Sequence, residues 1–421
     1  TTLGLQAAGS VTQTGGGSIA ADALGAKAQA GSVTLGSVNS VGTFAASAAG
    51  SVYLREADGY AIAEVGPSPL TVSSGANATA SVVEKITGVR AGTTIELITQ
   101  GGTVSQTADV SAANLALRGG AGYTLTRAGN AVGKLASDAA AQPGNANANG
   151  GDAGTVQYVN SGTLVLDGSF SLPSGIALPQ DTATARTGDV WVRALAGATA
   201  GDITVADKLT LNRLDAGKNV AALGLQAAGS VLQAADGATT SDAISTGHLA
   251  VRAQGGDVLL RSQRNEVGKF TAQALQGHVL LRESDGYELN TRAASPDTVV
   301  GGLAGVAGTA VFQAATSKAV EAGSAQQAKT VELQTTRGTV TQATDATADL
   351  SAANLVLRGG AAYELQRGGN TVTTLAADSG AGVIHYVNQG DLSLARVADA
   401  SLPSQQALQD GMALSRSGAV W

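Results

Sequence analysis

The stretch Ser111–Asp138, SAANLALRGGAGYTLTRAGNAVGKLASD, returns later in the chain as Ser351–Asp378, SAANLVLRGGAAYELQRGGNTVTTLAAD, with 19 of 28 positions identical. Within the first copy, Leu115 and Leu117 flank Ala116, and this alternation is typical of a β-strand. Glycine and asparagine break the alternation twice before further short apolar runs begin. Short strands separated by such corners predict a chain that winds around a core, one turn at a time.

A much longer module is duplicated in the same order. Leu3–Gln13, LGLQAAGSVTQ, returns as Leu223–Gln233, LGLQAAGSVLQ. The sequence therefore divides into a first module, residues 1–222, and a second, truncated copy, residues 223–421, which continues one solenoid. We interpret the chain as a segment of a longer array. Other matched segments are LREADGY and LRESDGY (Leu54–Tyr60, Leu281–Tyr287), SLPS (Ser171–Ser174, Ser401–Ser404), and RTGDVW and RSGAVW (Arg186–Trp191, Arg416–Trp421).

The two copies differ in length at two places. The second copy has additional residues between Val299 and Val331, and it has lost residues opposite Ala139–Gly154 of the first. Surface loops accept such changes at small entropic cost, whereas a slip inside a strand turns its apolar face outward. Both places are therefore expected to be loops.

The composition excludes several classes of protein. The 421 residues include 57 glycines and no cysteine, only 14% are charged and 3% aromatic, and the net charge is −7. Glycine at this density disfavours long helices, while regularly spaced Leu and Val argue against disorder. The negative charge argues against nucleic-acid binding, and no apolar run is long enough to form a transmembrane segment. The absence of cysteine suits a chain that crosses a membrane unfolded.

A small unit, glycine or a polar residue followed by an apolar–x–apolar triplet, recurs along the chain, often at spacings near those of Ile95, Leu115 and Leu135 or of Val258, Val279 and Val299. These spacings predict an all-β parallel β-helix of roughly 20 coils with about 20 residues each. A β-propeller or a leucine-rich repeat would show its own repeat signature, and a β-sandwich would need longer strands and more aromatic residues.

The unit AANLxLRGGAxYxLxRxGNxVxxLA resembles the repeats of filamentous-haemagglutinin-like large exoproteins of the two-partner secretion type. So do Ser40–Ala46 and Asn265–Ala272, each of which precedes a glycine and an apolar triplet. The resemblance implies a right-handed β-helix shaft on the surface of a Gram-negative bacterium. It also implies secretion through an outer-membrane β-barrel transporter and a role in adhesion or biofilm, with host-cell or matrix glycans and proteins as ligands.

The sequence carries no motif of a nucleotide-binding, zinc-protease or serine-hydrolase site. The best acidic pair is Glu56 with Asp58, repeated as Glu283 with Asp285. Side chains two residues apart on a strand point the same way, as in a glycosidase or a cation site. The Asp-Gly dipeptides, however, are ordinary turn signals, and the presence of the pair in both modules favours a role in the scaffold.

Other polar and aromatic residues are predicted to build the scaffold. Gly150–Gly154 only partly matches a calcium-binding repeat. We expect asparagines at corners and aromatic residues in core or corner packing rather than as glycan platforms. His248 and His278 each follow a glycine, and we expect them at exposed strand entries. The residues are Asn114, Asn130 and Asn160 with Asn354, Asn370 and Asn388; Tyr60, Tyr123 and Tyr158 with Tyr287, Tyr363 and Tyr386; Trp191 with Trp421; and His248, His278 and His385.

The sequence therefore predicts a structural and adhesive shaft segment rather than an enzyme, with no catalytic, cofactor-binding or metal-binding residues. One alternative is a self-assembling extracellular filament or sheath subunit, because open end coils are templates for end-to-end self-association. A less favoured alternative is a β-helical polysaccharide lyase or hydrolase. That enzyme would need a cluster of Asp, Arg or Lys on one face.

Overall fold

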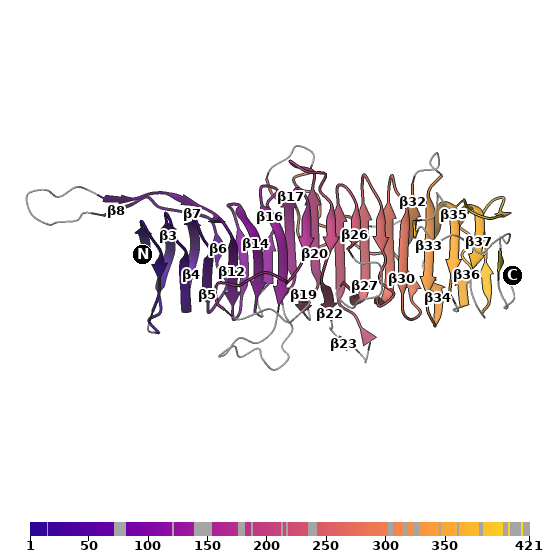
Figure 1. The fold of residues 1–421 in the computed structure, drawn as a ribbon, viewed down its shortest axis with the longest axis horizontal. Coiled ribbons are helices and arrows are strands. Elements are labelled where there is room, and N and C mark those ends of the chain that lie inside the picture. The colour runs from indigo at the N-terminus through magenta and orange to yellow at the C-terminus, as the bar shows by residue number, and fades with distance from the viewer. Residues whose placement is uncertain are drawn as a thin grey trace, which may run out of the picture.

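The protein is a single rod of stacked strands (Figure 1). In the described residues it has 40 strands and no helix. These residues therefore contain no helix that could cross a membrane. Of these strands, 34 form one continuous sheet, and every pairing within it is parallel. The computed structural model describes residues 1–14, 16–70, 81–119, 122–138, 154–175, 182–186, 188–211, 214–215, 218–234, 242–301, 306–314, 318–323, 328–344, 347–359, 362–378, 382–398, 403–404 and 414–415.

Fifteen strands form one row along the rod, each paired in parallel with the next. At about 4.8 Å per step, the fourteen steps give a rod about 70 Å long. The row consists of β2 (Val11–Thr12), β4 (Val33–Ala48), β5 (Val52–Glu56), β12 (Thr94–Thr99), β14 (Val110–Arg118), β16 (Ala131–Asp138), β18 (Leu164–Leu166), β21 (Ile203–Val205), β26 (Val231–Gln233), β28 (Val258–Leu260), β30 (Val279–Glu283), β33 (Thr330–Thr335), β35 (Leu350–Arg358), β37 (Thr371–Asp378) and β39 (Ser393–Leu394).

The other strands of the sheet complete the coils. They are β1 (Thr2–Ala7), β3 (Ala20–Ala28), β6 (Ala61–Ile62), β11 (Val89–Ala91), β13 (Thr103–Gln106), β15 (Gly122–Leu125), β17 (Val156–Ser161), β19 (Thr182–Arg186), β20 (Val190–Leu195), β22 (Lys208–Leu211), β25 (Ala222–Ala227), β27 (Ile244–Ala253), β29 (Glu266–Ala274), β31 (Glu288–Leu289), β32 (Val320–Ala322), β34 (Thr339–Gln342), β36 (Ala362–Leu365), β38 (Ile384–Tyr386) and β40 (Leu414–Ser415). The prediction of an all-β solenoid is therefore confirmed.

The core is a continuous column of apolar side chains inside the coils. Ile95, Leu115 and Leu135 lie directly above one another in register, and all three are buried. The alternation read from the sequence holds here, because Leu115 and Leu117 both face this column. Ala116 between them is also buried, since Leu172 from a surface loop covers it. The outer face of the sheet is therefore partly covered as well.

One of the regular spacings in the sequence predicted the wrong partner in the parallel ladder. Val258 and Val279 pair as expected, but the next residue in register is Val331 and not Val299. Val299 packs outside the coils, against Trp191. Excursions of this kind use residues without adding a coil, and the row therefore has fewer strands than the twenty coils expected from the sequence.

Only glycine fits at the corner that follows Arg118 and Arg358, because the backbone of the neighbouring coil lies very close there. Gly119 has a φ of 87° and Gly359 a φ of 100°. A Cβ atom at these positions would lie 2.0 Å and 1.7 Å from the carbonyl oxygens of Thr99 and Thr335 respectively. Both the left-handed backbone and the lack of space exclude a side chain, which explains the glycine after the LxLR sequence in both modules.

The parallel ladder runs across the boundary between the two sequence copies. β20 pairs with β25, so that Val190 is in register with Leu223 and Val192 with Leu225. β25 pairs in turn with β27. The backbone of the first module therefore continues into the second through the same hydrogen-bonding pattern that joins the coils within each module.

Two excursions leave the coils and lie on the outside. The first arm, described at residues 63–70 and 81–88, contains β7 (Glu64–Val65), β8 (Ser68–Leu70), β9 (Ser81–Val83) and β10 (Ile86–Thr87), and its strands pair antiparallel as β7–β10 and β8–β9. The second arm, described at residues 290–301, 306–314 and 318–319, has an antiparallel bridge between Thr298 and Ala310. A small antiparallel hairpin of β23 (Leu214–Asp215) and β24 (Lys218–Asn219) also lies outside the main sheet.

We expect Leu115→Ala to lower the free energy of unfolding by about 2–5 kcal/mol, because it leaves a cavity in the column. The measurement is the guanidinium midpoint followed by circular dichroism. Leu394→Ala is the control, since Leu394 is 54% exposed and its loss is expected to change stability by about 0.5 kcal/mol or less. Equal effects of the two substitutions would contradict a closed apolar core.

Candidate functional site: buried polar contacts and an acidic groove

The glutamates of the predicted acidic pairs are buried. The carboxylate of Glu56 accepts hydrogen bonds from the backbone N–H of Val41 at 3.2 Å and of Ala57 at 3.3 Å. Glu283 accepts from the backbone N–H of Val267 at 3.2 Å and of Asp285 at 2.6 Å. Burial raises the pKa of Glu56 to about 7 and that of Glu283 to about 8, against the backbone bonds that favour the charged form.

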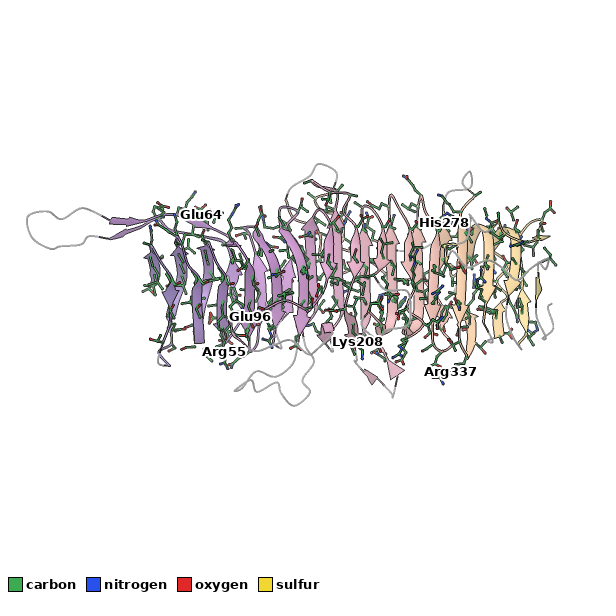
Figure 2. All side chains as sticks on the ribbon, viewed as in Figure 1. Arg55, Glu64, Glu96, Lys208, His278 and Arg337 are labelled. Atoms are coloured by element: carbon green, nitrogen blue, oxygen red, sulfur yellow. The ribbon has the colours of Figure 1, made fainter. Side chains whose placement is uncertain are left out.

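The aspartate of the second pair has a different partner. Asp285 accepts a hydrogen bond from Arg337 Nε at 2.6 Å, and both side chains are largely exposed. Figure 2 shows Arg337 at one edge of the rod. Glu283 thus ties one coil to the next inside the wall, while Asp285 forms an ion pair at the surface. This arrangement agrees with the scaffold interpretation of the pair.

A groove of about 490 Å³ lies beside Glu283 in the second module. It is lined by Glu266, Glu283, Asp285 and Glu288, with Lys269 among them. Lys269 Nζ lies 3.7 Å from Glu288 Oε1. The aligned positions of the first module are less acidic, because they carry Ser40, Thr43 and Ala61 in place of Glu266, Lys269 and Glu288. Within the described residues, no group of carboxylates or histidines has the geometry to hold a metal ion.

Asn130 and Asn370 occupy corners, as predicted, whereas Asn114 and Asn354 lie within strands β14 and β35 and donate to the hydroxyls of Thr94 and Thr330. Asn130 Oδ1 accepts the backbone N–H of Val110 at 2.9 Å, and its Nδ2 donates to the carbonyls of Leu125 and Val159, both at 3.1 Å. Asn370 makes the same set of contacts in the second module. Each amide satisfies backbone groups that the turning chain cannot pair in a ladder.

Two further corner asparagines were not recognised in the sequence. Asn39 Oδ1 accepts from the backbone N–H of Ile19, and Asn265 Oδ1 accepts from the backbone N–H of Ile244, both at 2.9 Å. Each pairs with a glutamine one coil away, as Asn130 pairs with Gln106. The signal that could have found them is the Val-x-Gln sequence that precedes each of these corners.

The tyrosines are part of the core and not a surface platform. Tyr123 donates from its hydroxyl to the carbonyl of Arg118 at 2.6 Å, and Tyr363 repeats this contact with Arg358. Tyr158 donates to Asn160 Oδ1 at 2.9 Å. Tyr60 and Tyr287 pack edge-on against Phe44 and Phe270. Tyr386 is half-buried and donates to Asn388, Trp191 is 2% exposed, and Trp421 lies outside the described residues, as do Gly150–Ala153 of the calcium-like motif.

The three histidines do not come together. His248 is buried rather than exposed, and its Nε2 is 2.9 Å from Thr271 Oγ1. Burial, with Arg292 and Lys269 nearby, lowers its pKa to about 3. His278 Nδ1 accepts the backbone N–H of Thr330 at 3.1 Å, and His385 lies 2.7 Å from a carboxylate oxygen of Glu364. The expectation of an exposed strand-entry side chain is therefore wrong for His248.

A buried ion-pair network in each module was not predicted. Arg118 Nη1 donates to Glu96 Oε1 at 2.8 Å and Arg118 also lies 3.6 Å from Asp138, with all three side chains nearly fully buried. Ser174 of the SLPS segment donates to the same glutamate from its backbone N–H at 2.9 Å and its hydroxyl at 2.8 Å. The glutamate therefore ties a surface loop to the wall of the rod.

The second module repeats this network. Arg358 Nε donates to Glu332 Oε1 at 2.6 Å, and Ser404 donates to Glu332 from its backbone N–H and hydroxyl. Repetition of the SLPS sequence, in step with the repeated Glu and Arg, was the available signal. The buried Arg and Glu side chains thus bond to each other and to the loop. This arrangement is suited to fixing the loop on the wall of the rod.

No family model, curated protein or solved structure matches the chain.

We expect Glu96→Gln to destabilise the protein by about 3 kcal/mol, because it leaves Arg118 buried with less compensating charge. Guanidinium unfolding measures the loss, and Glu332→Gln in the other module is expected to behave alike. Asp285→Asn is the matched control, since it removes an exposed ion pair whose contribution is about 1 kcal/mol or less. A Glu96 variant as stable as this control would contradict a buried network.

Glu283→Gln is expected to reduce the decrease in the free energy of unfolding that accompanies a rise in pH. Because the pKa of Glu283 is raised from 4.5 to about 8 by folding, the folded protein holds a proton that the unfolded chain releases, and stability falls as pH rises through this window. Unfolding midpoints between about pH 6 and pH 8 measure the slope, with an expected difference of order 1–3 kcal/mol. Ser284→Ala, which alters no titrating group, should keep the wild-type slope. An unchanged slope in Glu283→Gln would show that this carboxyl does not titrate there.

Proposed function

We propose that the chain is a structural and adhesive shaft segment of a secreted bacterial surface protein. Such a shaft holds a distal binding or effector region away from the cell and serves adhesion or biofilm formation. The observation that supports this most directly is the parallel ladder that continues through both modules, including the β20–β25 junction. A ladder without interruption transmits force along the rod through every coil.

The wall of the rod is suited to a mechanical role. Backbone groups that leave the ladder at corners bond to Asn130, Asn160 or Asn370, and the network of Glu96 and Arg118 ties a loop to the outer face. Satisfied backbone groups are protected from water and from proteases. The rod is therefore expected to be stiff and resistant to digestion.

The proposed partners follow from the repeat resemblance and the composition. We place the chain on the surface of a Gram-negative bacterium, after export through an outer-membrane β-barrel transporter. A chain with no cysteine threads unfolded without forming disulfides, and a solenoid folds by adding coils in sequence. Host-cell or matrix glycans and proteins are the proposed ligands of the intact protein.

A self-assembling filament or sheath subunit is the second candidate, and the end coils favour it. Leu394 is 54%, Val387 42% and Leu392 36% exposed at the C-terminal end of the described coils. At the other end Leu3 and Leu5 are only partly buried. Stacking these ends would cover apolar side chains and pair two strand edges.

An enzyme is the least supported candidate. A polysaccharide lyase or hydrolase would place its acidic and basic groups together on one face, and the acidic groove is the nearest approach to this in the described residues. There, Glu283 and Asp285 are engaged by backbone N–H groups and by Arg337. We therefore propose that the chain is not an enzyme.

Electron microscopy of the purified chain tests the shaft. We expect rods about 70 Å long, from fourteen strand spacings of about 4.8 Å, together with a β-rich circular dichroism spectrum. Regular fibres of fixed width would favour the filament. A compact globule would contradict both, and an assay for cleavage of acidic polysaccharides would then be the next measurement.

A further inference from the structure

The second arm is attached to the rod outside the parallel ladder. Leu289 pairs with Phe270 before the arm begins, and Val320 pairs with Ala272 after it ends, so that both of its flanks lie on β29. The described residues between these two pairs contribute no strand to the main sheet. The arm can therefore leave the surface of the coils while the ladder beneath it stays paired.

Hydrogen bonds from side chains hold the arm on the coils of the first module. Asp297 donates its backbone N–H to Gln157 Oε1 at 3.0 Å, and Arg193 Nη1 donates to the carbonyl of Ala310 at 2.8 Å. Gln157 lies on β17, which is separated from β29 by four strand pairings, through β20, β25 and β27. The arm is thus held across several coils by contacts that are separate from the ladder.

An apolar cluster completes this contact. Phe312 of the second arm packs on Trp191 with 5.7 Å between ring centroids, and the guanidinium of Arg292 lies 5.2 Å from the centroid of the tryptophan ring. Trp191 lies over Gly224, where a Cβ atom would be 2.1 Å from the ring. The tryptophan is 2% exposed in this arrangement. Both an aromatic ring and a cation of the arm therefore cover Trp191.

A buried histidine is linked to the root of the arm, residues 290–292. Leu249 on β27 faces the core, so that its neighbour His248 lies on the outer face of the strand, where it is 6% exposed. His248 Nε2 lies 2.9 Å from Thr271 Oγ1, and this hydroxyl donates to the carbonyl of Asn290 at 2.6 Å. Because a hydroxyl has a single proton, Nε2 must donate to Thr271. A chain of two hydrogen bonds thus joins the imidazole to the first residue of the arm.

The groups that face His248 favour its neutral form. Lys269 faces it from β29 and Arg292 from the arm, and burial together with these two cations lowers the pKa of His248 to about 3. The carboxylates beside the cations are engaged by them: Asp189 lies 3.9 Å from Arg292, and Glu288 lies 3.7 Å from Lys269. A second proton on the imidazole would therefore place a third positive charge between Arg292 and Lys269.

The sign of the pH effect follows from the two states of the arm. With the arm docked, the imidazole stays neutral down to a pH of about 3. With the arm lifted, the ring meets water and its pKa returns to about 6.5. The lifted state therefore binds a proton that the docked state does not, and acid favours it. Its population is expected to rise about tenfold for each pH unit between 6.5 and 3.

We propose that the root of the second arm is an acid-sensitive latch, in which a charge on His248 repels Arg292 and releases the arm from Trp191 while the coils stay folded. Release uncovers Trp191, Gln157 and Arg193, which are buried when the arm is docked. The latch is a property of the solenoid and its arm, and it does not depend on the shaft function.

Hydrogen exchange of the full chain, followed by mass spectrometry, tests the latch. The backbone N–H groups of Asp297, Val300 and Gln313 bond to the coils, so that they exchange when the arm lifts. Their protection factors, corrected for the intrinsic effect of pH on exchange, are compared at pH 7.5 and pH 5. The lower pH lies above the ordinary pKa values of aspartate and glutamate, about 3.9 and 4.3. The amides of β27 report on opening of the coils themselves.

We expect the protection factors of the arm amides to fall about 30-fold between pH 7.5 and pH 5, while those of β27 do not fall. In His248→Gln, a side-chain amide can still donate to Thr271 but does not titrate, and the fall should be absent. An equal fall in this variant, or none in the unmodified chain, would overturn the latch. A parallel fall in β27 would show that the coils open with the arm and would overturn it as well. If circular dichroism shows that His248→Gln does not fold, His248→Phe, which keeps a ring without a titrating group, takes its place.

Discussion

The parallel register between successive coils is the constraint on which the rest of the structure depends. Ile95, Leu115 and Leu135 lie above one another because each strand pairs residue for residue with the next. A slip of one residue would turn all of these side chains outward at once. The apolar column and the backbone ladder therefore stabilise each other, and neither would form in an isolated coil, since a single short strand is marginal in water.

Polar residues carry this register around the corners. A turning backbone loses its ladder partners, and Asn130 and Asn370 replace them with side-chain amide groups. The buried Glu96 and Arg118 do a related task on the outer face, where a loop through Ser174 lies against the wall. These groups recur in both modules because the geometry of the coil recurs, and an isolated buried charge would be costly.

Local patterns in the sequence were sufficient for the coil. The alternation at Leu115 and the recurrence of short triplets predicted parallel stacking, and the asparagine corners were predicted from turn chemistry. The sequence could not reveal that Val299 leaves the ladder, because its spacing from Val279 equals that of a true coil. Nor could it reveal the contact of Glu96 with Ser174, since the two lie 78 residues apart and meet only when the loop folds back.

In a solenoid of similar coils, strand pairing alone does not determine which two coils become neighbours. Its end strands pair with any strand of matching pattern, so that the ladder alone does not distinguish the correct neighbour from one displaced by a coil. The second arm reduces this ambiguity inside the chain, because Phe312 packs on Trp191 where Trp191 lies over Gly224. The ladder provides the strength of a junction, and the arm determines which two coils meet there.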